Sequence, residues 1–140
     1  MRIKFILTLL ITLFTLQFAN AQTTIDRVSA LEVIHLVTDA NSKLNHIYRE
    51  RVAGHEEEQA ALQKAIYAAN TELMAIRSML SGNNMIKTDK YAKLQKPLED
   101  LQTAIDAVDL SVATVELQKQ ISVVQTKAMK LKKMVAKLKK

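Results

Sequence analysis

Apolar residues recur at alternating steps of three and four along most of the chain, and this spacing places them on one face of an α-helix. We call each such row of positions a seam. The first seam lies in a predicted helix over residues 24–53 and consists of Ala30, Val33, Val37, Ala40, Leu44 and Ile47. The second consists of Leu62, Ile66, Ala69, Leu73, Ile76 and Leu80.

Two further seams follow in the second half of the chain. The third seam consists of Tyr91, Leu94, Leu98, Leu101, Ile105, Val108, Val112 and Val115. The fourth consists of Leu117, Ile121, Val124, Ala128, Leu131, Val135 and Leu138. No run with the period of two that marks a strand follows the N-terminal segment, so we expect an all-α protein.

Breaks between the seams are few. Residues 81–84 read Ser-Gly-Asn-Asn and predict a chain reversal, because Gly and Asn tolerate the left-handed backbone that ends helices. Gly54 is a weaker break, and the fourth seam is out of phase with the third near residues 109–111, where we expect a turn or a coiled-coil stutter. Thr88 or Asp89 is placed to cap the third helix, and Pro97 either starts a new helix or kinks a continuous one.

Two architectures fit these breaks. If Gly54 and the region near residue 109 are turns, three or four long helices form an antiparallel bundle in a single domain over residues 22–140. If neither is a turn, two long helices form a coiled-coil hairpin that must oligomerise, because a lone hairpin buries little surface. The bundle is the favoured prediction.

The N-terminus carries the pattern of a cleavable secretory signal peptide over residues 1–21. Arg2 and Lys4 precede an apolar run over residues 5–18, and Ala-Asn-Ala follows over residues 19–21. The run is shorter than the roughly 20 residues that a membrane span needs. We therefore expect export to the periplasm or the medium, with cleavage before Gln22. The chain has no cysteine, so helix packing rather than disulfides must stabilise the exported form.

Positive charge is concentrated at the C-terminus. Eight lysines and no acidic residue follow Glu116, whereas residues 22–116 carry more acidic than basic side chains. A basic amphipathic helix of this kind is a candidate for binding an anionic membrane or polymer. The same pattern is also typical of the last helix of a bundle, whose lysines are favourable at the negative end of the helix dipole. The candidate residues are Lys127, Lys130, Lys132, Lys133, Lys137, Lys139 and Lys140.

Catalytic, metal and cofactor motifs are not evident. His35, Asp39, His46 and Glu50 share one side of the first helix, but opposite its apolar seam, where exposed ion pairs are the simpler interpretation. His55 is followed by three glutamates, yet Gln59 stands where a zinc-protease helix needs its second histidine. The lysine-rich segment lacks arginine and aromatic residues, which argues against nucleic acid as a partner. We expect no enzymatic activity, no cofactor and no small-molecule substrate.

The remaining function classes are non-catalytic. The principal prediction is an interaction or assembly component of a bacterial cell envelope, with a protein partner or a second copy docking on the third seam, Tyr91 to Val115. The layout of a signal peptide followed by long helices is similar to that of the helical periplasmic minor-pilin components of conjugation and type IV secretion systems. A periplasmic holdase is an alternative, since size and basic balance look like those of Skp-type chaperones, although that family adds a small β-rich body. Binding of an anionic surface through the lysine-rich helix is the third possibility.

Overall fold

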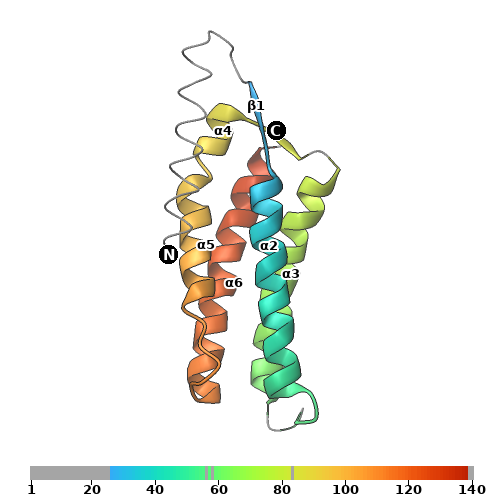
Figure 1. Cartoon of the computed structure of the whole chain (residues 1–140), viewed down its shortest axis with the longest axis vertical. Helices are drawn as coiled ribbons and strands as arrows, with labels where there is room; N and C mark the ends of the chain where they lie inside the picture. Colours follow the sequence, from blue (N-terminus) through green and yellow to red (C-terminus); the bar gives the residue numbers. More distant parts are fainter. Residues whose placement is uncertain (1–25, 56, 58, 83, 139–140) are drawn as a thin grey trace.

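Four long helices lie side by side in one bundle (Figure 1). The computed structural model describes residues 26–55, 57, 59–82 and 84–138. The long helices are α2 (Leu31–Ile47), α3 (Ala60–Ser81), α5 (Gln95–Asp106) and α6 (Thr114–Lys137). The predicted helical bundle is thus confirmed. The predicted signal peptide and its cleavage site lie outside the described residues.

Both weak breaks are turns, which rules out the long two-helix hairpin. After α2 the chain continues through one π-helical turn, η1 (Tyr48–Val52), and then reverses at Gly54. Gly54 has a φ of 88°, in the left-handed region that glycine adopts without steric cost. The second reversal joins α5 to α6. There the Asp109 carboxylate accepts hydrogen bonds from the backbone N–H and hydroxyl of Ser111, and these bonds lower the pKa of Asp109.

The helices are not packed in the order in which they follow one another in the chain. Contacts join α2 to α3, α3 to α6, α6 to α5 and, more sparsely, α5 to α2, so α3 and α5 lie on a diagonal. As Figure 1 shows, α3 and α6 both run towards the end of the bundle that carries the short sheet. These two parallel helices share the most extensive contact in the protein. Both helices carry small buried residues, Ala65 and Ala69 on α3 and Ala128 on α6.

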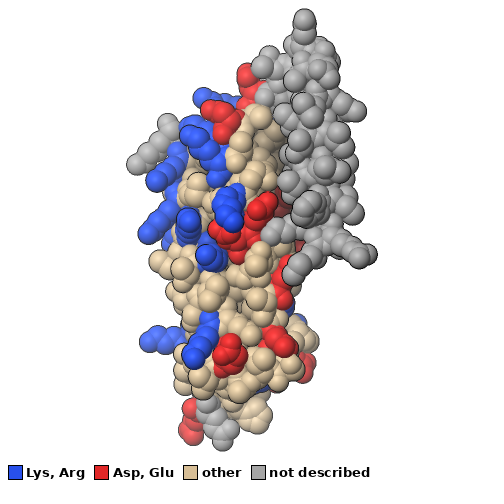
Figure 2. Space-filling view, turned by 90° about the vertical axis from the view of Figure 1, so that its left-hand side faces the viewer, with Lys and Arg blue, Asp and Glu red and all other residues tan. Residues whose placement is uncertain are grey.

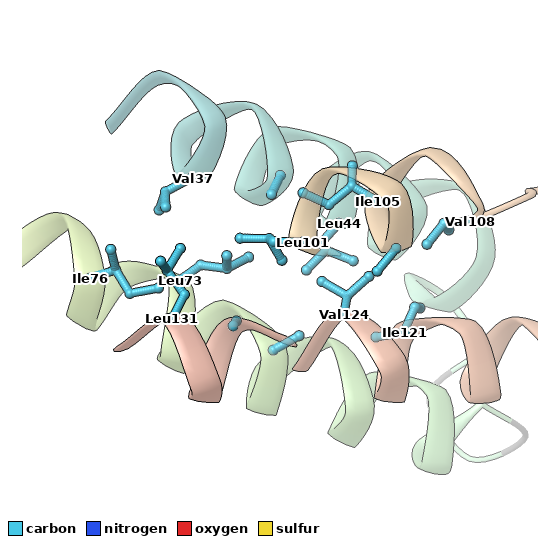
Figure 3. Close-up of a cluster of buried hydrophobic side chains, with 14 of the residues drawn as sticks. Val37, Leu44, Leu73, Ile76, Leu101, Ile105, Val108, Ile121, Val124 and Leu131 are labelled. Atoms are coloured by element: carbon cyan, nitrogen blue, oxygen red, sulfur yellow. The ribbon is translucent and has the colours of Figure 1, made fainter. Parts of the chain in front are cut away.

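The four seams meet in a single core. Leu44, Leu73, Leu101, Val124 and Leu131 point towards one another from four different helices (Figure 3). All five are at most 3% exposed. Within the described ranges, no polar or charged residue is buried. The bundle is therefore held together chiefly by burial of apolar surface.

A short antiparallel sheet closes one end of the bundle, and this corrects the expectation that the chain contains no strand. β1 (Arg27–Ser29) pairs with β2 (Met85–Lys87) so that Val28 lies opposite Ile86. Because residues 27–29 are a strand, α2 begins at Leu31, not near residue 24 as expected. Three residues are too few to establish a period of two, so no sequence pattern marked either strand.

The third seam spans several elements instead of one long helix. It begins in α4 (Thr88–Ala92), crosses a turn at Lys93 and Leu94, and continues along α5. Pro97 is the third residue of α5 and has no N–H to bond to the carbonyl of Lys93, so the helix is interrupted just before it. Of the two expectations for Pro97, the start of a new helix is the one observed. Helix α4 begins at Thr88 with Lys87 at its N-cap position, so Thr88 and Asp89 lie in the first turn and not at the cap position predicted for them.

Arg51 ties together the two turns at the end of the bundle opposite the sheet. Its Nη1 donates to the carbonyl oxygens of Leu110 (2.7 Å) and Val112 (3.2 Å), and its Nη2 donates to Thr114 Oγ1 (3.1 Å). The guanidinium thus supplies hydrogen-bond donors to carbonyl oxygens of the α5–α6 connection, which lie outside the two helices.

Replacing Arg51 by Gln is expected to lower the free energy of unfolding by about 2 kcal/mol, because hydrogen bonds from a charged donor contribute about 1.5–3 kcal/mol. Urea unfolding followed by circular dichroism measures this. The control is Arg49→Gln, which removes the same charge from an exposed neighbour and should change stability by less than about 0.5 kcal/mol. Equal effects of the two substitutions would contradict a specific role for Arg51.

Candidate functional site

The third seam, predicted to receive a partner, faces the inside of the bundle over most of its length. Tyr91, Leu94, Leu101, Ile105 and Val108 are buried in the chain's own core, and Leu98 and Val112 pack against that core. The Tyr91 hydroxyl donates a 2.8 Å hydrogen bond to a carboxylate oxygen of Glu32 on α2. Burial and this carboxylate raise the pKa of Tyr91. Val115 is the exception, at 65% exposure.

Helix α6 presents two opposite faces. Its inner face carries the predicted fourth seam, of which Leu117, Ile121, Val124, Ala128, Leu131 and Val135 are all buried. Positions 119, 130, 133 and 137 fall on the opposite side of a helix, and all four are exposed lysines. The inner apolar face is therefore occupied by α3 and α5, and the outward face, which carries these lysines and also exposes Val123 and Met129, is open to a partner.

Three of the seven candidate lysines lie on this outer face: Lys130, Lys133 and Lys137 follow one another at steps of three and four. We call these three residues the lysine face. Figure 2 shows basic side chains gathered towards one end of the molecule, with acidic side chains beside them. Lys139 and Lys140, also candidates, lie outside the described residues.

The other two candidates lie at the flanks of α6 and interact with acids. Lys132 is half-buried and forms an ion pair with Glu72 of the neighbouring helix α3. Lys127 lies on the α5 side, where its charge contributes to lowering the pKa of Asp100. These two lysines serve contacts within the bundle and are less available to an external anion.

Asp100 is an acid on which the charge of Lys130 acts. It lies on α5 and forms an ion pair with Lys96 at 3.2 Å, one helical turn earlier. Its hydrogen bond with Lys96 lowers the pKa of Asp100, and the charges of Lys127 and Lys130 act in the same direction. Asp100 thus stays ionised at neutral pH and offsets part of the positive charge at the α5 edge. Lys133 and Lys137 have no such acid next to them among the described residues.

The outer face of α3 is the other exposed surface with a distinct character. Tyr67, Thr71, Met74 and Ser78 follow one another on it, and none carries a charge. Tyr67 stacks on Tyr48 with ring centroids 5.9 Å apart, while Met74 is 62% exposed. Since the third seam is covered by the chain itself, this face is the better candidate surface for a protein partner.

The histidines considered as metal ligands are dispersed over the surface. His35, Asp39, His46 and Glu50 are all exposed on α2 and η1, as their position opposite the first seam predicted. No group of three or more potential ligand side chains comes together in the part of the chain that the structure describes. In the same part, no helix combines the length and apolarity needed to cross a bilayer.

Sequence reasoning found the lysine-rich segment but missed the acids that flank it. Glu72 and Asp100 lie 60 and 27 positions before the side chains Lys132 and Lys127 that they approach, and their pairing depends on which helices are neighbours. The spacing of Lys96 and Asp100, four apart on one helix, is the only part of this arrangement with a local signal.

Comparison with known proteins adds no family: no family model, curated protein or solved structure matches the chain.

Proposed function

We propose that this chain is an exported, non-catalytic binding protein of a bacterial cell envelope, and that it docks on an anionic lipid surface through the lysine face of α6. The observation that carries the proposal is the exposure of Lys130, Lys133 and Lys137 on one helix face. Among the described residues, none of the three forms an ion pair. Export itself rests on the N-terminal sequence pattern.

Packing of α6 restricts how such binding works. A helix that lies in a membrane interface inserts its apolar side chains, but here Ile121, Val124 and Leu131 are buried against other helices. The folded domain therefore offers mainly charge to the lipid at this face, beside the exposed side chains of Val123 and Met129. Each lysine near an anionic membrane contributes about 1 kcal/mol, so three give weak and reversible binding.

A contact made chiefly by charge is sensitive to salt, and this gives the direct test. The protein, expressed with its own leader and purified as the cell processes it, is sedimented with vesicles of phosphatidylglycerol and phosphatidylcholine. Raising the salt from about 0.01 M to about 1 M shortens the Debye length from about 30 Å to about 3 Å, so binding should be lost. Vesicles of phosphatidylcholine alone are the control and should bind no protein at any salt concentration. Salt-independent binding, or equal binding to both vesicles, would refute the proposal.

A further inference from the structure

The two-stranded sheet and the bundle enclose a pocket at the end of the molecule where α6 finishes. Its volume is about 370 Å³, within the range of small-molecule sites. Strand β2 forms one wall, and the last turns of α3 and α6 form the others. Six of the eight described residues around it are apolar: Met79, Leu80, Met85, Ile86, Val135 and Leu138.

The apolar residues range from buried to exposed. Leu80, Ile86 and Val135 are buried, Met79 and Leu138 are half-buried, and Met85 is 42% exposed. The pocket thus has an apolar interior that opens to solvent past flexible side chains. Methionine side chains adapt to irregular ligands, so this lining suits an alkyl chain better than a rigid polar molecule.

The remaining two residues around the pocket are both cations, Arg27 and Lys87. They are directly paired across the sheet, Arg27 on β1 opposite Lys87 on β2. Like charges at such a position destabilise strand pairing. Both side chains are exposed, and neither forms an ion pair within the described part of the chain. A bound anion would remove this repulsion, and arginine can hold a carboxylate through two hydrogen bonds.

We infer that this pocket binds one molecule of a single-chain anionic amphiphile of the fatty-acid type. The carboxylate lies between Arg27 and Lys87, and the alkyl chain lies along Met79 and Leu138. None of the three residues of the lysine face lines the pocket, so the inference goes beyond the proposed function and does not depend on it. A ligand at this position bridges the sheet, α3 and α6, and therefore stabilises the end of the bundle.

The test is titration calorimetry with dodecanoate below the concentration at which it forms micelles. We expect saturable binding of one molecule per chain. Octanoate should bind at least about tenfold more weakly, because it buries less apolar surface. Dodecyltrimethylammonium, with the same chain length and the opposite charge, should not bind. Equal affinity for the anionic and cationic amphiphiles, or binding to vesicles without binding to monomeric dodecanoate, would overturn the inference.

Substitutions locate the site. The double variant Arg27→Gln with Lys87→Gln should weaken dodecanoate binding by about tenfold or more, since hydrogen bonds from charged donors are the strong ones. The matched control is Arg49→Gln with Lys64→Gln, which removes two exposed charges at the opposite end of the bundle and should leave the affinity within about twofold. Unchanged affinity in the pocket variant would refute the assignment.

A second variant tests the apolar part of the pocket and leaves both cations in place. Leu138→Glu changes no residue of the sheet and places a carboxylate on the pocket wall, where it should repel dodecanoate and reduce its affinity by a similar factor. The variant Lys130→Gln, Lys133→Gln, Lys137→Gln, which tests the lysine face, should retain dodecanoate binding within about threefold. Loss of dodecanoate binding in this triple variant, with none in Leu138→Glu, would place the site elsewhere and overturn the inference.

Discussion

Replacing Leu101 by Ala is expected to lower the free energy of unfolding by about 3 kcal/mol and the melting temperature by roughly 10 °C. Leu101 is fully buried and lies at the centre of the core, where side chains of all four long helices converge (Figure 3). Removing its isobutyl group leaves a cavity that the surrounding helices only partly fill. Urea unfolding of the variant should shift to a lower midpoint with an unchanged slope, since the surface exposed on unfolding is nearly the same.

The control is Val115→Ala, at the last position of the same third seam. Val115 is 65% exposed, so truncating it should change stability by less than about 0.5 kcal/mol. The pair of variants separates two roles of the seam. If the seam serves the internal core, Leu101→Ala destabilises a species of unchanged mass. If it holds copies together, Leu101→Ala lowers the mass measured by light scattering, and that outcome would contradict the internal role described here.

Helices were predictable from the sequence because their signal is local. The alternation of steps of three and four identified the buried positions of α2, α3 and α6, and Gly54 and Gly82 lie where the chain leaves a helix. The strands were not predictable, because each has only three residues and the paired residues Val28 and Ile86 are 58 positions apart in the sequence. Arg51 illustrates the same limit: nothing near it in sequence indicates that it bonds to Leu110 and Val112.

The candidate site was half predictable for the same reason. Clustering of lysine after Glu116 is visible in the sequence, and helical spacing separates the outer lysines from the inner seam. The spacing cannot show which helix packs against each side of α6. Lys132 meets Glu72 only because α3 and α6, which are not consecutive in the chain, are neighbours in the bundle. An apolar seam is equally ambiguous, since an internal core and a partner interface both require the same periodicity.

The bundle topology explains why the positive charge remains exposed. Helix α6 packs against α3 on one side and α5 on the other, and each supplies an acid, Glu72 or Asp100, at its own flank. The outward side has no neighbouring helix among the described elements, and Lys133 and Lys137 form no ion pair with any described residue. Because these lysines contribute little to packing, their substitution should change binding and leave the fold intact.

The triple variant Lys130→Gln, Lys133→Gln, Lys137→Gln is expected to bind phosphatidylglycerol vesicles about a hundredfold more weakly than the unsubstituted protein at low salt. Three lysines at about 1 kcal/mol each give this factor. The dependence of binding on salt should become shallower as well, since fewer charges are screened. Unfolding midpoints should stay close to those of the unsubstituted protein, because all three side chains are exposed.

The matched control removes three exposed charges from α3 and η1 instead, through Arg49→Gln, Lys64→Gln and Arg77→Gln. Both triple variants have the same net charge, so a difference between them reports where the charge lies and not how much there is. If the two bind vesicles equally, attraction depends on net charge alone and the lysine face has no special role. If only the α6 variant loses binding, the contact is local to α6, and the acid-free sequence after Glu116 is the feature that produces it.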